Sequence, residues 1–149
     1  MGLTYDNPWL FNNEPFDTDQ IGKFEGFVYC ITNKLNNKRY IGRKYFYNIR
    51  KVRGKKKRVR TESDWKEYYG SSNQLLEDIQ KYGMMNFERR IVSLHITRGD
   101  CNYEEVKQQF MNNVLEEEGW YNETIGNYRR KPKHIVEARE YGRDRNEHG

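Results

Sequence analysis

Two short apolar runs on either side of a turn place the strongest constraint on how this chain can fold. The first run, residues 26–32 (GFVYCIT), is rich in β-branched and aromatic side chains, and the second, residues 39–43 (RYIGR), follows the asparagine-containing segment NKLNNK. Runs of this composition around such a turn are typical of a β-hairpin. The sequence therefore predicts two antiparallel strands, joined by a loop longer than a two-residue turn.

A helix is predicted over residues 71–83 (SSNQLLEDIQKYG). Ser71 and Gln74 match a capping box, and Gly83 is a residue type that commonly ends helices. At helical spacing four apolar residues share one face, which we expect to be buried: Leu75, Leu76, Ile79 and Tyr82.

The downstream half predicts a third strand and a second helix. Residues 87–97 (FERRIVSLHIT) are typical of a strand, and the apolar residues expected to anchor it are Phe87, Ile91 and Val92. The helix should run from about Asn102 to Glu118, with an apolar side made of Tyr103, Val106, Phe110 and Val114. The predicted class is therefore α+β: a small antiparallel three-stranded sheet flanked by helices, with a basic insert after the second strand.

A chain of 149 residues is expected to hold one domain. Residues 1–22 contain Pro8 and Pro15 and show no clear period, so we expect an N-terminal arm there. The folded domain should span residues 23–130, and residues 131–149 form a mostly charged C-terminal tail. Twelve Tyr, seven Phe and three Trp can supply much of the apolar area that the core needs.

The positive charge is concentrated in one stretch. Residues 26–61 contain thirteen Lys or Arg and no Asp or Glu, which leaves 14 of the 27 basic residues and all 22 acidic ones for the rest of the chain. Such a bias is expected of a surface that binds the phosphates of nucleic acid, whereas a short KKKR run alone would equally suit a solvated loop or a localisation signal. The residues expected to contact nucleic acid are Lys44, Arg53, Lys55, Lys56, Lys57, Arg58 and Arg60.

An ordered set of motifs adds a resemblance to a known family. Residues 27–29 (FVY) and 40–42 (YIG) carry two tyrosines eleven positions apart, and Arg50 follows the second tyrosine by ten. The segments YGMMNFERRIV, YEEVKQQF and WYN come later in that order. Together these motifs resemble the GIY-YIG nucleases over roughly residues 26–122. The ESDWKEYYGSS block is most similar to phage-type, homing-endonuclease-like members.

The chain also departs from the family pattern. Phe27 stands where the first motif has glycine, and Gly26 lies one position early. The basic segment GKKKRVR lengthens the chain after the second motif, in the region where the family has a helix carrying the arginine that Arg50 would match. No histidine follows Arg50 closely, although some members have one.

The resemblance implies the chemistry of phosphodiester hydrolysis. Tyr40 would accept the proton of the attacking water and Tyr29 would help to position that water. Arg50 would hold the scissile phosphate through two oxygens, and Arg43 would be a second phosphate contact. An unperturbed tyrosine titrates near 10, so Tyr40 needs assistance from cations or a metal to act as a base at neutral pH. Asn122 would orient the site without touching the substrate.

The resemblance further implies that Glu105 ligates one Mg²⁺ per active site, for which Mn²⁺ could substitute. Two alternatives stay open. Asn102 and Glu105 also match a capping box, which would place Glu105 at a helix start for local reasons. Glu104 is a rival ligand, since on a helical wheel it falls between Met111 and Leu115.

The expected function is a metal-dependent endonuclease that hydrolyses the phosphodiester bonds of double-stranded DNA. The alternative is a non-catalytic nucleic-acid-binding protein that keeps the nuclease fold, for which Phe27 is the best support. With two cysteines, no recognisable signal peptide and no apolar run of membrane-spanning length, we expect a cytoplasmic protein of a bacterial or phage-infected cell. Sequence specificity, biological role and oligomeric state are left open.

Overall fold

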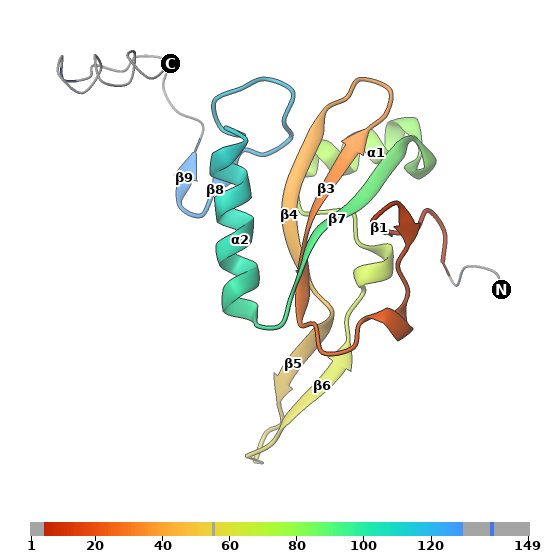
Figure 1. The fold of residues 1–149 in the computed structure, drawn as a ribbon, viewed down its shortest axis with the longest axis vertical. Coiled ribbons are helices and arrows are strands. Elements are labelled where there is room, and N and C mark those ends of the chain that lie inside the picture. The colour runs from red at the N-terminus through yellow and green to blue at the C-terminus, as the bar shows by residue number, and fades with distance from the viewer. Residues whose placement is uncertain (1–4, 55, 130–137, 139–149) are drawn as a thin grey trace.

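The computed structural model describes residues 5–54, 56–129 and 138. Its central strand β3 (Gly26–Asn33) pairs antiparallel with β4 (Arg39–Tyr45) on one side and with β7 (Phe87–His95) on the other (Figure 1). The predicted hairpin is confirmed, and its register puts Tyr29 opposite Gly42. The predicted α+β class is confirmed as well.

The sheet is larger than predicted. Short strands β1 (Leu10–Phe11) and β2 (Glu14–Pro15) extend it beyond β7, and β1 runs parallel to β7. The sheet is therefore five-stranded and mixed, in the order β2-β1-β7-β3-β4, rather than three-stranded and antiparallel. Strands of two residues are too short to show an alternating pattern, so no periodicity predicts them.

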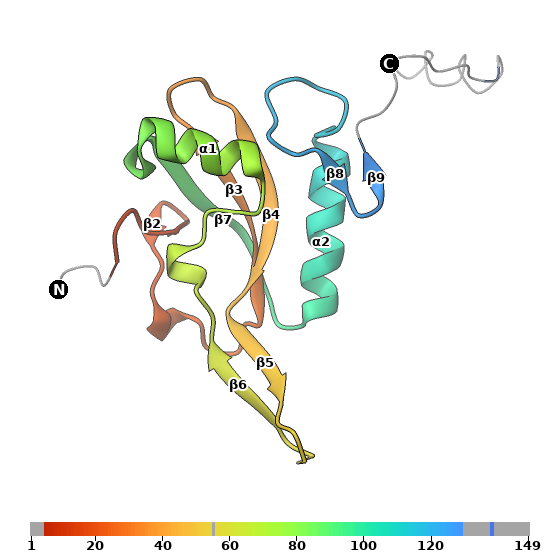
Figure 2. The ribbon, with the colours of Figure 1, turned by 180° about the vertical axis from the view of Figure 1, so that it is seen from behind.

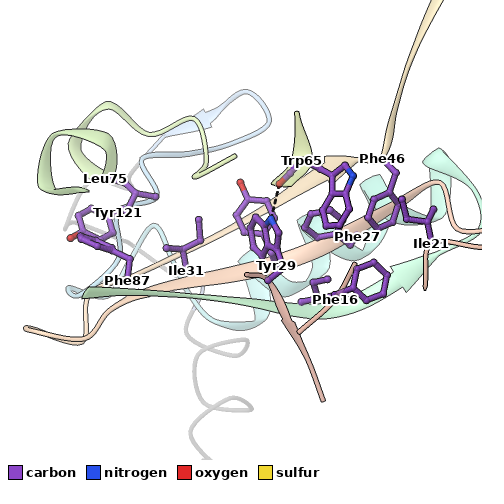
Figure 3. Close-up of a cluster of buried hydrophobic side chains, with 12 residues drawn as sticks. Phe16, Ile21, Phe27, Tyr29, Ile31, Phe46, Trp65, Leu75, Phe87 and Tyr121 are labelled. Atoms are coloured by element: carbon purple, nitrogen blue, oxygen red, sulfur yellow. Dashed lines mark hydrogen bonds between the residues drawn. The ribbon is translucent and has the colours of Figure 1, made fainter. Parts of the chain in front are cut away.

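An aromatic core fills the face of the sheet to which Phe27 and Tyr29 of β3 belong (Figure 3). Part of the segment expected to be an arm is built into it, since Trp9 and Phe16 are buried. The Trp9 indole donates a hydrogen bond of 2.7 Å to the carbonyl oxygen of Trp65. This contact ties the N-terminal segment to the loop that precedes the first helix.

Phe27, the residue that replaces the motif glycine, belongs to this core. Its ring centroid lies 5.0 Å from that of Trp9 and 4.9 Å from that of Phe46. The need for glycine falls on Gly26 instead, where an added Cβ would lie 2.9 Å from the Lys44 carbonyl oxygen. The shifted motif therefore has a packing explanation.

The first predicted helix is observed as α1 (Asn73–Tyr82), which is seen in Figure 2. Its Leu75 side chain packs onto the aromatic core (Figure 3). Its N-cap is Ser72, whose hydroxyl accepts a hydrogen bond from the Leu75 amide, so the predicted cap at Ser71 is wrong by one residue. Two residues assigned to its buried face are in fact exposed: Leu76 and Tyr82. The shift leaves the Ser71 side chain available for a different contact.

The second predicted helix is observed as α2 (Arg98–Met111) on the opposite face of the sheet. The Thr97 hydroxyl caps it by accepting from the Asp100 amide at 3.1 Å. The predicted start at Asn102 and end at Glu118 are therefore wrong. Glu105 lies inside the helix, so the alternative that it belongs to a capping box with Asn102 is wrong.

The predicted apolar side of α2 faces away from the sheet. The exposed residues are Tyr103, Val106, Phe110 and Met111. The buried side instead carries Cys101 and Gln109, with Glu105 half-buried between them. Val114 is buried, but it lies beyond the end of the helix. Polar side chains on the packed face are typical of an element that carries a functional site toward its neighbour.

The basic insert forms a second hairpin, made of β5 (Tyr47–Lys51) and β6 (Arg58–Glu62), which projects beyond the main sheet (Figures 1 and 2). The resemblance implied a helix in this region, so the hairpin is a correction. A third small hairpin joins β8 (Thr124–Ile125) and β9 (Tyr128–Arg129). Three short 3-10 helices complete the described chain: η1 (Thr18–Gln20), η2 (Trp65–Glu67) and η3 (Met84–Asn86). The anchor Val92 assigned to the third strand is exposed, while Phe87 and Ile91 are buried as predicted.

In the part of the chain that the structure describes, every helix is too short or too polar to cross a membrane.

Candidate active site

Two tyrosines from the central hairpin lie side by side on one face of the sheet. Tyr29 of β3 is opposite Gly42, and Tyr40 lies two residues before that glycine on β4. The two ring centroids are 6.2 Å apart. Tyr68, from the loop after η2, packs edge-on against Tyr29 at 6.1 Å. Three phenol rings thus meet at the outer edge of the sheet, because β4 is an edge strand.

Gly42 makes this arrangement possible. A Cβ at position 42 would lie 2.7 Å from Cζ of Tyr29 and closer still to its hydroxyl oxygen, and 2.9 Å from Cε2 of Tyr40. The Tyr29 side chain therefore reaches across the backbone of Gly42. The glycine of the second motif is required by this close approach of the two rings to the strand.

Burial sets the protonation of both tyrosines. It raises the pKa of Tyr29 well above its ordinary value, and the neighbouring Tyr40 and Tyr68 raise it further. Burial also raises the pKa of Tyr40, against which a hydrogen bond to Ser71 acts in the opposite direction. The Tyr40 hydroxyl lies 3.0 Å from Ser71 Oγ. Both phenols are accordingly protonated at neutral pH in the free protein.

Arg43 and Glu105 meet on the other side of β4. Arg43 Nε lies 3.1 Å from Oε1 of Glu105, which projects from α2. Burial raises the pKa of the Glu105 carboxyl, and the charge of Arg43 partly opposes this shift. The charge of Glu105 in turn contributes to the raised pKa of both Tyr29 and Tyr40. The carboxylate and the two phenols therefore act on one another electrostatically around the edge of β4.

Asn122 holds the backbone of this edge. Its side-chain oxygen accepts from the Ile41 amide at 3.1 Å, and its side-chain nitrogen donates to the Ile41 carbonyl at 2.8 Å. Gln109 of α2 donates to the same carbonyl at 3.0 Å. The buried Asn122 side chain thus pairs with the backbone N–H and C=O groups of Ile41, as a neighbouring strand would do. This geometry fixes the orientation of the motif rather than offering a group to a substrate.

A cleft of about 360 Å³ connects this site to the second hairpin. Arg43 and Tyr68 line one part of it, and Tyr47, Asn48 and Ile49 of β5 line another. Lys44, Tyr45 and Arg98 complete its lining. The lining carries three cations, so a phosphate backbone lying in this cleft would be electrostatically favoured.

The structure separates Arg50 from the tyrosines. Arg50 lies on β5, opposite Val59, where its side chain is exposed. A strand therefore occupies the place where the resemblance expected a helix. The arginine next to the motif is Arg43. It follows Gly42 on β4, and its ion pair with Glu105 holds its side chain at the edge of that strand.

The residues expected to bind nucleic acid are spread over the second hairpin and its base. Lys44 pairs with Asp64 at 2.6 Å and lies over the ring of Tyr68. Arg60 pairs with Glu25 at 2.6 Å. Arg53, Lys56 and Lys57 lie between the two strands and Arg58 begins β6. Lys55 lies outside the described residues.

Sequence reasoning assigned no role to Tyr68 or to Arg89, which positions it. The guanidinium of Arg89 is 1% exposed and donates to the carbonyl oxygen of Tyr68 at 2.8 Å and to that of Asn7 at 2.6 Å. Burial lowers its pKa. Tyr68 lies in the ESDWKEYYGSS block that supported the resemblance, so a signal existed. Arg89 occupies a buried position of β7 between Phe87 and Ile91, where alternation predicts an apolar residue, so its charge at that position was the signal that was missed.

Glu104 and Glu105 are the two rival ligands for a metal ion. Both are half-buried, and each carboxylate has one polar partner: Glu105 pairs with Arg43 at the edge of β4, and Glu104 accepts a hydrogen bond from Gln108 of its own helix at 2.6 Å. Within the described ranges, no group of three or more His, Cys, Asp or Glu is placed to bind a metal together. Mg²⁺ commonly keeps several waters and uses one or two carboxylates, so a single desolvated glutamate fits this ion and does not fit a site built wholly from protein ligands.

Comparison with known protein families decides the relationship. Residues 9–125 match the family model described as "Putative endonuclease segE, GIY-YIG domain". The chain belongs to the GIY-YIG nuclease family. Comparisons with curated proteins and with solved structures each gave no match. The match begins at the buried Trp9, so it includes the N-terminal residues that this GIY-YIG domain builds into its sheet and core.

Proposed function

We propose that this GIY-YIG domain is a metal-dependent endonuclease that hydrolyses phosphodiester bonds of double-stranded DNA at the edge of β4. One observation carries the proposal. Tyr29 and Tyr40 converge over Gly42 on one side of this edge, while Arg43 and Glu105 meet on the other. A phosphate at the edge would be within reach of a proton acceptor, a guanidinium and a metal-binding carboxylate.

Tyr40 is proposed to receive the proton of the attacking water. Because burial keeps this phenol protonated, it can accept a proton only while releasing its own. Ser71 Oγ, 3.0 Å away and exposed to solvent, can accept this proton while passing its own to a solvent water, so that the proton leaves the site through a relay. Burial raises the pKa of Tyr29 well above its ordinary value, so Tyr29 stays protonated. Its hydroxyl can then donate a hydrogen bond to a phosphate oxygen or to the attacking water.

Arg43 is proposed to bind the scissile phosphate in place of Arg50. Its guanidinium is already aligned along β4 by Glu105, and the cleft that it lines leads to the second hairpin. A guanidinium can bind two phosphate oxygens at once. Arg50, on the exposed hairpin, is better placed to contact DNA away from the reacting phosphate.

Glu105 is proposed to hold the Mg²⁺ ion, for which Mn²⁺ could substitute. When bound there, the ion would supply charge stabilisation for the phosphorane-like transition state and for the leaving oxygen. Burial of the carboxylate supports the assignment, because a desolvated anion gains more from a cation than a solvated one does. Asn122 and Gln109 would act at a distance, by holding the backbone of Ile41.

The alternative, a binding protein without turnover, loses its main support. It relied on Phe27, and the ring of Phe27 packs in the aromatic core between Trp9 and Phe46. The substitution therefore fills the core and does not remove a group from the site.

Supercoiled plasmid tests the proposal. Purified protein is incubated with the plasmid and either Mg²⁺ or EDTA, alongside the variant Glu105→Gln. Nicked or linear product that forms only with Mg²⁺, and not with the variant, is the expected result. Plasmid that stays intact with every divalent metal tried but is retarded on a gel would overturn the proposed hydrolysis in favour of binding alone.

A further inference from the structure

The second hairpin has no packing of its own that explains its presence. Apart from the first residue, Tyr47, all residues of β5 and β6 are exposed. An isolated two-stranded hairpin is at best marginally stable in water. The register nevertheless pairs all five residues of each strand, from Tyr47 opposite Glu62 to Lys51 opposite Arg58. Beyond Tyr47, the ribbon is therefore open to solvent along its whole length.

The two faces of this hairpin differ. One face carries Tyr47 and Arg60, and it is attached to the body: Arg60 pairs with Glu25 at 2.6 Å, and its guanidinium lies 4.0 Å from the centroid of Tyr47. Arg98 also donates to the Tyr47 carbonyl oxygen at 2.6 Å. These contacts fix the base of the ribbon through one side only.

The other face carries Asn48, Arg50, Val59 and Thr61, which the register groups as two cross-strand pairs. The side chains of Asn48, Arg50 and Thr61 form no hydrogen bond or ion pair with any part of the chain that the structure describes. These are the side-chain types that read base edges: Asn binds adenine, Arg binds guanine through two acceptors, and Thr or Val contacts the thymine methyl group.

We propose that the β5–β6 hairpin enters the major groove of double-stranded DNA and reads bases with this face. The inference rests on the proposed function, and it explains how the nuclease would be directed to a particular DNA sequence. Strands of five residues are about 17 Å long. The groove is about 12 Å wide and 8.5 Å deep, so it admits a two-stranded ribbon of this length.

The surrounding charges suit this placement. Lys51, Arg53, Lys56, Lys57 and Arg58 lie at the far end of the ribbon, where they can bind phosphates on both walls of the groove. A-form RNA does not offer an equivalent site, because its major groove is deep and narrow. The choice is therefore B-form DNA.

The hairpin is coupled directly to the active site. β4 ends at Tyr45 and β5 begins at Tyr47, with the buried Phe46 between them. The cleft lined by Arg43 and Asn48 spans the same junction. Bases read by the hairpin therefore lie at a fixed distance from the phosphate that is cut.

A binding selection in EDTA tests the inference without depending on cleavage. The wild type, Asn48→Ala/Arg50→Ala and the control Lys56→Ala/Lys57→Ala are each used to select from a pool of random-sequence 30-base-pair duplexes. The wild type should enrich a motif, and the first variant should lose that enrichment by roughly tenfold or more per base read. The control should bind more weakly and with a smaller salt dependence, but to the same motif.

Methylation interference on the selected duplex then identifies the groove. Methylation of guanine N7, in the major groove, should weaken wild-type binding, and methylation of adenine N3, in the minor groove, should not. Any of four results would overturn the inference. The wild type selects no motif, Asn48→Ala/Arg50→Ala keeps the motif, methylation interferes at adenine N3 alone, or the protein binds duplex RNA more tightly than duplex DNA. A protein that selects the motif but leaves a plasmid carrying that motif intact with Mg²⁺ would refute the proposed hydrolysis and keep the groove assignment.

Discussion

At the scale of single residues, the site depends on the lack of a side chain at Gly42. The hydroxyl of Tyr29 occupies the space where a Cβ of residue 42 would stand, and Tyr40 closes that space from the same strand. Gly70 adds a second close approach, since a Cβ there would lie 3.2 Å from Cε2 of Tyr40. The positions of both phenols are therefore set by glycines as much as by their own packing.

Gly42→Ala is expected to displace Tyr29 and to destabilise the fold by about 1–3 kcal/mol, as overpacking of a buried site does. Cleavage should fall with it, because the two tyrosines no longer share one edge. Chemical denaturation and the plasmid assay measure the two effects. Gly99→Ala is the matched control, since nothing lies within 4 Å of a Cβ there and its stability should be unchanged or slightly higher. Equal effects of the two substitutions would contradict the close approach.

Glu105 should make stability depend on pH. Its folded-state pKa is raised by burial, so the folded protein holds the proton more tightly than the unfolded chain does. The ionised carboxylate therefore costs stability above the raised pKa, and the cost disappears as the pH falls through that pKa to below the ordinary value of 4.5. Glu105→Gln should be more stable than the wild type at pH 7, and the difference should shrink on acidification.

Mg²⁺ provides an independent control on this glutamate. Added Mg²⁺ should raise the Tm of the wild type and leave that of Glu105→Gln unchanged, because only the wild type binds the ion in its folded state. A wild type more stable than the variant at pH 7 without metal would contradict the burial argument. An equal rise in Tm for both proteins would contradict the assignment of the metal to Glu105.

At the scale of elements, the edge of β4 decides how the site is built. An exposed edge strand is left with unpaired backbone groups. Here the chain covers part of the edge with residues 119–122: the Arg39 amide donates to the Gly119 carbonyl oxygen at 2.9 Å, and the Tyr121 amide donates to the Arg39 carbonyl oxygen at 2.7 Å. Asn122 continues this pairing with its side chain at Ile41.

Asn122→Leu tests whether this pairing positions the motif. Loss of both hydrogen bonds should reduce the free energy of unfolding by about 1–3 kcal/mol. The cleavage rate at saturating DNA should fall further than DNA affinity measured in EDTA, because Asn122 holds the strand and does not contact DNA. Asn127→Leu, at an exposed turn, should change stability by less than about 0.5 kcal/mol. Affinity that falls as much as the rate would argue for a direct contact with DNA.

Elements that bury an apolar pattern could be predicted from the sequence, and elements that serve the site could not. The β3–β4 hairpin and β7 follow the pattern of their apolar residues. In α2 the packed face holds Glu105 and Gln109, whose polar groups bind Arg43 and the Ile41 carbonyl, so a search for an apolar stripe selected the wrong side. The cap of α1 was misplaced because Ser71 contacts Tyr40 across 31 residues of chain.

The β5–β6 hairpin also could not be predicted from a pattern of apolar residues. Both of its faces are exposed, so no alternation of apolar and polar residues distinguishes it from a loop. The concentration of thirteen basic residues over residues 26–61 was visible in the sequence and indicated nucleic acid. Which of these residues lie on the face attached to the body, and which lie on the other face of the hairpin, could be assigned only from the register of the two strands.

At the scale of the whole molecule, positive charge is concentrated at one end of the long axis. The basic hairpin projects at one end, and the acidic residues 116–118 follow α2 at the other (Figure 1). The concentration of positive charge on the hairpin attracts a polyanion to that end of the molecule. The cleft that begins at Asn48 of the hairpin leads past Arg43 to Tyr68, beside the paired tyrosines at the edge of β4.

The most direct test of this account is single-turnover cleavage of DNA by Tyr40→Phe. The change removes one hydroxyl, which contacts Ser71 at 3.0 Å, and leaves the ring that packs beside Tyr29. We predict a fall in rate of roughly 100-fold or more, typical of the loss of a general base, with Tm and DNA affinity in EDTA close to the wild type. A variant that cuts within tenfold of the wild-type rate would contradict proton transfer at Tyr40 and would require a different active site.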